Sequence, residues 1–138
     1  MKELICLLRA MQLYGHSCHH LVKGTPFHSD HNFFADVYSE VEADFDSVVE
    51  RSIGLYGDGH MNLQECLSSV ISKIADAPSI NVESNKVYYD YQLKLEDKLT
   101  NLVKQVIAAG VSPGTEQLIG NIADKSEVRK YKIKQRIK

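Results

Sequence analysis

Apolar residues recur along this chain every three or four positions, which is the period of an amphipathic α-helix. The longest series alternates steps of four and three positions and comprises Phe27, His31, Phe34, Tyr38, Val41, Phe45 and Val48. A seam sustained over so many turns predicts one helix, over about residues 27–56, that packs along its whole length. We expect glycines to end this helix, at Gly54, Gly57 and Gly59.

The same pattern predicts three further long helices and one short helix. The first covers about residues 2–22 and has an apolar stripe of Leu4, Leu8, Met11, Cys18 and Val22. A third long helix is expected over about residues 82–109, and a fourth from Ser112-Pro113 or Thr115 to near the end. In the middle connection, NLQECLSSVISKI predicts a short helix with Asn62 as its cap and Glu65 as its capping-box partner.

The lengths of the connections predict how these helices are arranged. Short connections make the first and second long helices antiparallel, and likewise the third and fourth. The long middle connection lets the third helix run parallel to the second. The expected fold is therefore all-α, a ferritin-like four-helix bundle with a short helix in the long crossover, forming a single domain over residues 1–138.

Composition narrows the class of protein. The chain is 43% hydrophobic and 25% charged with a net charge of −2, which argues against a uniformly basic nucleic-acid binder. Its three cysteines, Cys6, Cys18 and Cys66, are odd in number and widely spaced, which fits a reducing compartment. Arg9 interrupts the apolar start of the chain, and no run is long enough to span a membrane. We therefore expect a cytoplasmic protein with no membrane partner.

Histidines are concentrated in one stretch, HSCHHLVKGTPFHSDH, which holds five of the six and runs from His16 to His31. Imidazole is a common metal ligand, so the cluster indicates a candidate metal site. Ferritin-like di-iron proteins usually carry Glu-x-x-His on two helices, and this chain has no such motif. A di-iron site inside the bundle of one subunit is therefore disfavoured.

The second helix offers a different arrangement of ligands. Relative to His31, Asp46 lies about 60° and Glu50 about 100° around the helix, so the three share one broad face. Fifteen residues span roughly 22 Å, however, so His31 and Asp46 of one helix cannot bind the same ion. If two copies cross antiparallel near residue 40, His31 of one meets both carboxylates of the other, giving two equal sites per dimer. His19 could join His31, and such a mixed nitrogen and oxygen set suits Fe(II) or Zn(II).

The spacing H-x(4)-G-x(2)-F-x(3)-H-x(14)-D-x(3)-E-R resembles the ferroxidase signature of the Dps family, mini-ferritins named as DNA-binding proteins from starved cells. Here it is formed by His19, Gly24, Phe27, His31, Asp46, Glu50 and Arg51. The resemblance implies a hollow dodecamer of two-fold dimers that oxidises iron(II), preferably with hydrogen peroxide, and stores ferric mineral. It implies that His19 and His31 of one subunit and Asp46 and Glu50 of its neighbour hold at most two irons, with zinc as a substitute.

Two departures from the family pattern bear on the second iron position. Family members usually have Trp directly after the first histidine, whereas this chain has His20 there and no Trp at all. Many also have a carboxylate four residues after the second histidine, where this chain has Ala35, with Asp36 about 100° further round the helix. We therefore expect a weaker second position, or one completed by His20.

The C-terminal stretch KSEVRKYKIKQRIK carries seven basic residues and one acidic residue. It is either a solvated helix end that complements the helix dipole or a patch for DNA phosphates on the outside of the shell. Because the first helix begins almost at Met1, we expect no basic N-terminal tail, and only weak DNA binding through the C-terminus. Two other functions stay open, namely a DNA-compacting shell with a vestigial metal site and a non-enzymatic metal-binding helical module.

Overall fold

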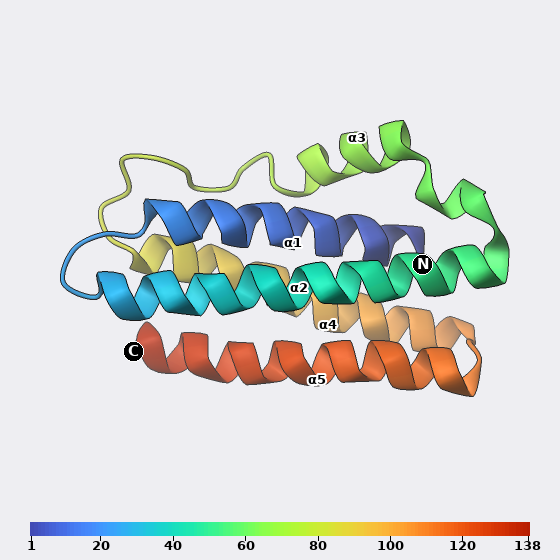
Figure 1. Cartoon of the computed structure of the whole chain (residues 1–138). Coiled ribbons are helices and arrows are strands. Elements are labelled where there is room, and N and C mark those ends of the chain that lie inside the picture. Colours follow the sequence, from blue (N-terminus) through green and yellow to red (C-terminus); the bar gives the residue numbers. More distant parts are fainter.

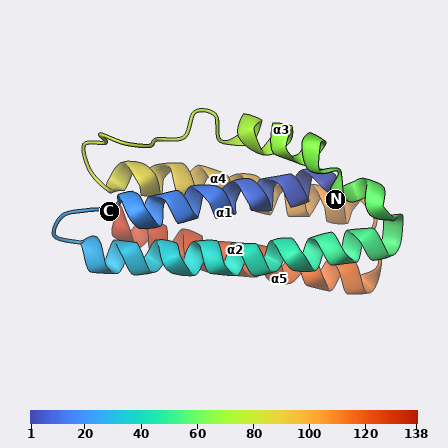
Figure 2. The same cartoon turned by 45° about the horizontal axis from the view of Figure 1, so that its top comes forward.

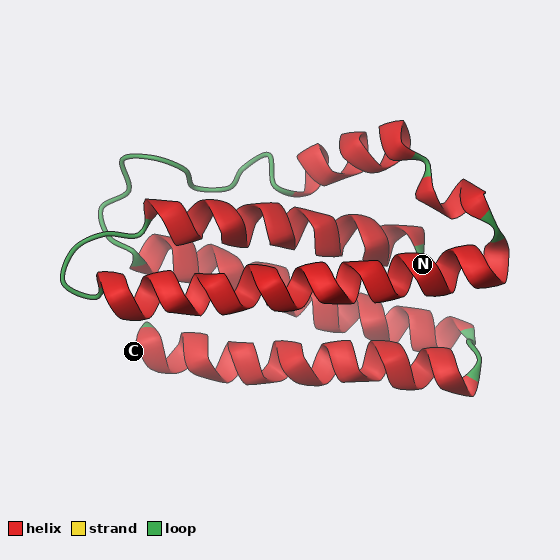
Figure 3. Cartoon of the chain, viewed as in Figure 1, coloured by secondary structure: helices red, strands yellow, loops and turns green.

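A computed structural model describes all residues, 1–138, and is built of helices and loops without strands (Figure 3). Four long helices lie lengthwise against one another (Figure 1), namely α1 (Lys2–Leu21), α2 (Phe27–Tyr56), α4 (Lys86–Ala109) and α5 (Pro113–Arg136). The crossover between α2 and α4 holds a short 3-10 turn, Asp58–Met61, and the helix α3 (Leu63–Lys73). The predicted all-α, ferritin-like bundle with a short crossover helix is confirmed.

The chain direction in each helix also agrees with the prediction. α1 and α2 run antiparallel across a short turn, and so do α4 and α5 (Figure 1). The crossover returns along the outside of the bundle past α1, so α4 starts at the same end as α2 and runs parallel to it. Around the bundle, α1 contacts α2 and α4, and α5 contacts the same two helices.

One hydrophobic cluster fills the space between the long helices. The whole α1 stripe is buried, as its spacing predicts. The α2 seam is fully buried at Phe34, Val41, Phe45 and Val48 and half-buried at Phe27, His31 and Tyr38. The seam therefore packs as predicted, and His31 is one of the positions that keep contact with solvent.

The predicted helix ends are largely confirmed. Asn62 caps α3 by accepting a hydrogen bond from the Glu65 backbone N–H at 3.0 Å, but the Glu65 side chain lies near Lys2, 3.8 Å away, and does not complete the capping box. Ser112 caps α5 by accepting from the Thr115 N–H at 3.3 Å. Gly110 has a φ of +95°, a conformation that favours glycine, and α4 ends there.

The start of α4 is a correction to the sequence prediction, because the helix begins at Lys86 rather than near residue 82. Buried Asn85 accepts a hydrogen bond from the Lys23 N–H at 3.1 Å and donates to the Lys23 carbonyl at 2.7 Å. These contacts hold Asn85 against the α1–α2 turn, so the preceding residues stay in the crossover. None of the helices combines the length and the apolar character that a membrane span requires.

A buried ion pair joins α4 to α5 inside the bundle. Glu96 is fully buried and receives two hydrogen bonds from the Arg129 guanidinium, at 2.7 and 2.9 Å. Ser126 and Gln92 donate to the same carboxylate at 2.6 and 2.7 Å. Both oxygens of Glu96 are thus committed to protein donors, as a buried carboxylate requires.

Candidate metal centre

His19, near the end of α1, and His31, near the start of α2, lie against each other across the α1–α2 turn. Their ring centroids are 3.6 Å apart and their planes are inclined by 23°, so the imidazoles are stacked. The Phe27 ring also stacks on His31, with centroids 4.8 Å apart. The two histidines that the sequence places twelve residues apart are therefore in contact in the fold.

Each of these imidazoles also bonds to the backbone of the other residue. His19 Nδ1 lies 2.8 Å from the His31 carbonyl oxygen, and His31 Nδ1 lies 2.7 Å from the His19 carbonyl oxygen. A carbonyl oxygen can only accept, so both Nδ1 atoms carry the proton. A neutral ring in this tautomer keeps its lone pair on Nε2. Metal-binding histidines are commonly held by a hydrogen bond of this kind on the nitrogen that does not bind metal.

Asp46 and Glu50 lie one turn apart on α2 and are both exposed. Arg51, the neighbouring base, donates to Thr115 Oγ1 at 3.2 Å and joins α2 to α5. No group of three or more His, Cys, Asp or Glu side chains converges in this chain to hold a metal ion. The structure thus brings His19 and His31 together and leaves Asp46 and Glu50 apart from them, further along α2.

Further aromatic side chains surround the histidine pair. The exposed His20 ring lies 5.0 Å from both His19 and His16, centroid to centroid. The sequence pattern identifies Tyr38 only as a residue of the α2 seam, but its ring centroid lies 4.3 Å from that of His16 and 5.4 Å from that of His19. Tyr38 follows His31 by two helical turns, and this spacing could have predicted that it lies beside the histidines. Asp36 is exposed on α2.

Asp30, the residue before His31, anchors the start of α2. It is fully buried and accepts hydrogen bonds from Tyr89 at 2.6 Å, from Asn85 at 2.9 Å and from two nitrogens of Arg136 at 2.9 Å. Burial would raise the pKa of Asp30, but these hydrogen bonds outweigh it and lower the pKa. Contacts to α4 and α5 therefore fix the backbone that presents His31.

The basic C-terminus is largely committed to the bundle. Four of its seven basic residues form ion pairs within the chain, Lys125 with Asp44, Arg129 with Glu96 and Glu40, Lys130 with Asp97, and Arg136 with Asp30. The three that have no acidic partner are exposed and comprise Lys132, Lys134 and Lys138. The solvated positive surface is therefore smaller than the sequence indicates.

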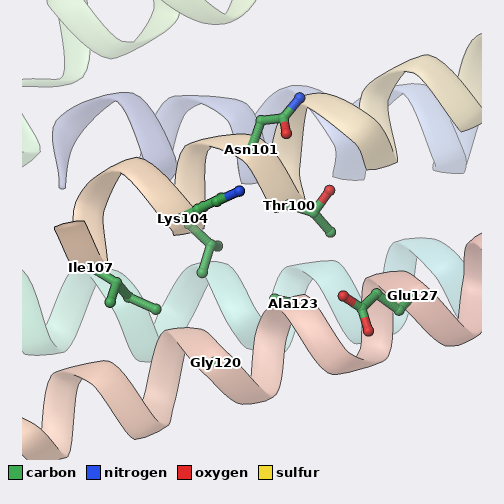
Figure 4. Close-up of a pocket in the computed structure, with 8 residues that line it drawn as sticks. Thr100, Asn101, Lys104, Ile107, Gly120, Ala123 and Glu127 are labelled. Atoms are coloured by element: carbon green, nitrogen blue, oxygen red, sulfur yellow. The ribbon is translucent and has the colours of Figure 1, made fainter.

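An open groove of about 380 Å³ lies between α4 and α5 (Figure 4). Its charged side chains are Lys104 and Glu127, and it is otherwise lined by Thr100, Asn101, Val103, Ile107, Gly120 and Ala123. It has a single carboxylate and no histidine, and its helices supply none of the four predicted ligands. The chemistry of the groove therefore does not fit a site for iron.

Comparison with known proteins gives one informative match. No family model matches the chain. A curated relative, a nutrient stress-induced DNA-binding protein from a Nostoc species, is 28% identical over 138 residues. The matched region covers 94% of this chain and 71% of the relative. The similarity thus extends over nearly the whole chain rather than the histidine-rich stretch alone.

Proposed function

We propose that this chain is a member of the Dps family that oxidises iron(II) at sites shared between two subunits and stores the ferric product in a hollow shell. The observation that carries the proposal is the reciprocal hydrogen bonding of His19 and His31, which leaves both Nε2 atoms available. His19 and His31 lie at the end of the molecule where α2 begins, and the exposed carboxylates of Asp46 and Glu50 lie further along α2. Each pair would be half of a site, and a second subunit would supply the other half.

A two-fold dimer would complete each site. If α2 of one subunit crosses α2 of another antiparallel near residue 40, His19 and His31 meet Asp46 and Glu50 of the partner subunit. Asp46 and Glu50 are exposed and have no partner within their own chain, so they are free to turn toward the neighbour. Each dimer would then hold two equivalent sites.

Iron(II) is the substrate of the proposed reaction. Two imidazoles and two carboxylates form a mixed donor set that suits Fe(II) and that Zn(II) can also occupy. One hydrogen peroxide accepts two electrons, so two Fe(II) ions become two Fe(III) ions while the oxygen–oxygen bond breaks. At most two irons would bind per site. Ala35 supplies no ligand, so the second position would depend on His20 or Asp36, both of which are exposed.

Exposed apolar side chains support assembly into the proposed dodecamer. Leu63, Leu67 and Ile71 lie four residues apart along α3, with exposed fractions of 62%, 48% and 67%. A run of this kind on one helix face is unfavourable in water and is typical of a surface that another subunit covers. We therefore include self-association through α3 in the proposal.

The proposed function is tested by replacing both carboxylates with alanine. Asp46→Ala with Glu50→Ala should slow peroxide-driven iron(II) oxidation at least about tenfold, the scale of effect when metal ligands or their supports are lost. Asp124→Ala with Glu127→Ala is the matched control, because it removes the same charge from exposed positions of α5. Helicity and native mass should be unchanged in both. Oxidation at the unmodified rate in the first variant would refute the proposal.

A second candidate function is a DNA-compacting shell with a vestigial metal site. It is favoured by the name of the curated relative and by the three exposed lysines of the C-terminus. A third, a metal-binding helical module without catalysis, would bind iron without oxidising it. Iron oxidation kinetics distinguish the ferroxidase from the other two functions. A DNA gel shift measured at several salt concentrations distinguishes the DNA-compacting shell from the metal-binding module.

A further inference from the structure

Two cysteines that the iron chemistry does not use lie side by side. The Sγ atoms of Cys6 on α1 and Cys66 on α3 are 3.6 Å apart, although sixty residues separate them in the sequence. Each of these two residues is 7% exposed, so both thiols are nearly buried. Cys18 lies elsewhere in the core, is fully buried and has no cysteine beside it.

A small cavity opens onto this pair of thiols. Its volume is about 40 Å³, and its lining includes both Cys6 and Cys66 together with His60, Asn62 and Glu65. A cavity of this volume holds a molecule of about the size of water, and hydrogen peroxide, with two oxygen atoms, is only slightly larger.

The position of α3 allows the two sulfur atoms to approach. α3 lies outside the four-helix bundle and is joined to it by the short 3-10 turn on one side and by an irregular segment on the other (Figure 2). It buries only Cys66 and Val70. A disulfide bond is about 2.05 Å long, so closure requires a movement of roughly 1.5 Å. A peripheral helix with so few buried groups can move by this amount without disturbing the bundle core.

We propose that Cys6 and Cys66 form a peroxide-oxidisable dithiol, a modification site at which hydrogen peroxide makes a disulfide between α1 and α3. One thiol loses its proton, and the resulting thiolate attacks peroxide, so that the oxygen–oxygen bond breaks and a sulfenic acid and hydroxide form. The hydroxide takes up the proton that the thiol lost and becomes one water. The second thiol then displaces hydroxide from the sulfenic sulfur, giving the disulfide and a second water. The two sulfurs lose two electrons in total, and peroxide accepts both.

The reaction is expected to be slow, and it does not depend on the proposed iron site. Burial raises the pKa of the Cys66 thiol to about 11, and thiols with raised pKa react slowly because the thiolate is the nucleophile. The disulfide would tether α3 to α1, next to the ion pair between Lys73 and Glu3 at 2.7 Å. Peroxide would thereby fix the crossover helix that carries the exposed apolar stripe.

The experiment treats the metal-free protein with a modest excess of hydrogen peroxide and follows free thiols and intact mass. The protein begins with three free cysteines, and the expected product retains one thiol and has lost two hydrogen atoms. Peptide mapping should find Cys6 linked to Cys66 in the same chain, and dithiothreitol should restore both thiols.

Single variants provide the matched controls. Cys18→Ser should still form the disulfide, whereas Cys6→Ser and Cys66→Ser should not. Glutathione in a separate tube gives the time in which the same peroxide oxidises an ordinary thiol, and the protein is incubated for many times longer because its thiols react slowly. The proposal is overturned if all three thiols survive that incubation, if the disulfide joins different chains or includes Cys18, or if either cysteine ends as a sulfinic or sulfonic acid.

Discussion

His19 and His31 each donate an imidazole Nδ1–H to the backbone carbonyl of the other, at 2.8 and 2.7 Å, across the turn between α1 and α2. The two bonds close the turn and hold the two rings in a stack. The same interaction thus stabilises the helical pair and leaves each Nε2 available for a ligand. At this position a change of sequence should affect both the fold and the proposed chemistry.

His31→Ala should therefore lower the free energy of unfolding and slow iron oxidation together. The lost hydrogen bond and ring packing are expected to cost about 1–2 kcal/mol, and oxidation should slow about tenfold. Urea unfolding and peroxide-driven oxidation measure the two effects. His28→Ala, at an exposed position of the same turn of α2, should change stability by no more than about 0.5 kcal/mol. A His31→Ala protein that oxidises iron at the normal rate would show that this imidazole is not a ligand.

Asp30 should make the fold sensitive to acid. Hydrogen bonds lower its folded-state pKa below the unfolded value of about 4 despite burial, so the ionised carboxylate favours the folded state. That stability is fully present above about pH 4 and is lost as the pH falls through the folded-state pKa. Asp30→Asn should cost about 2 kcal/mol at pH 7, less than a fully buried pair because Arg136 is one-third exposed.

The difference in unfolding free energy between the wild-type protein and Asp30→Asn should shrink as the pH is lowered below about 4 and through the folded-state pKa of Asp30. Denaturant unfolding of the metal-free proteins at several pH values measures it. Asp90→Asn, at an exposed position of α4, is the control and should show no such dependence. A constant difference across this range would contradict the role assigned to the Asp30 carboxylate.

DNA binding should be weak and should depend on the three unpaired lysines of the C-terminus, Lys132, Lys134 and Lys138. The net charge of −2 per chain repels phosphate, and several subunits would have to contact one duplex together. We expect no gel shift near physiological salt, where screening reaches about 8 Å, and a weak shift at low salt and mildly acidic pH. Replacing the three lysines with alanine should remove it. A tight, salt-resistant complex at pH 8 would favour the DNA-compacting alternative.

The helices could be predicted from the sequence because their apolar residues follow the helical period without interruption. α2 begins at Phe27 and ends at Tyr56, as its seam indicates, and Ser112 and Asn62 act as caps at the expected positions. The start of α4 could not be predicted, because it depends on Asn85 meeting a turn more than sixty residues earlier in the chain. Local patterns locate helices well and locate such distant polar contacts poorly.

The candidate site, like the fold, could be predicted from the sequence only in part. The spacing of His19 and His31 predicted that the two meet, but it gave no sign that each ring bonds to the backbone of the other. The basic C-terminus could not be interpreted from charge alone, because the partners of Arg129 and Arg136 lie on α4 and α2. Cys6 and Cys66 likewise have no spacing that indicates a pair. The roles of Asp46 and Glu50 stay a prediction that concerns two chains.

A mixture of two defective subunits tests the shared site most directly. When His31→Ala subunits are co-expressed with Asp46→Ala/Glu50→Ala subunits, a mixed two-fold dimer has one site with both defects and one site with none. Random pairing makes half of the dimers mixed, so about one quarter of all sites should be intact. We predict that peroxide-driven iron(II) oxidation recovers to about one quarter of the wild-type rate, while each variant alone stays near background. A mixture no faster than either variant alone would contradict a site shared between subunits.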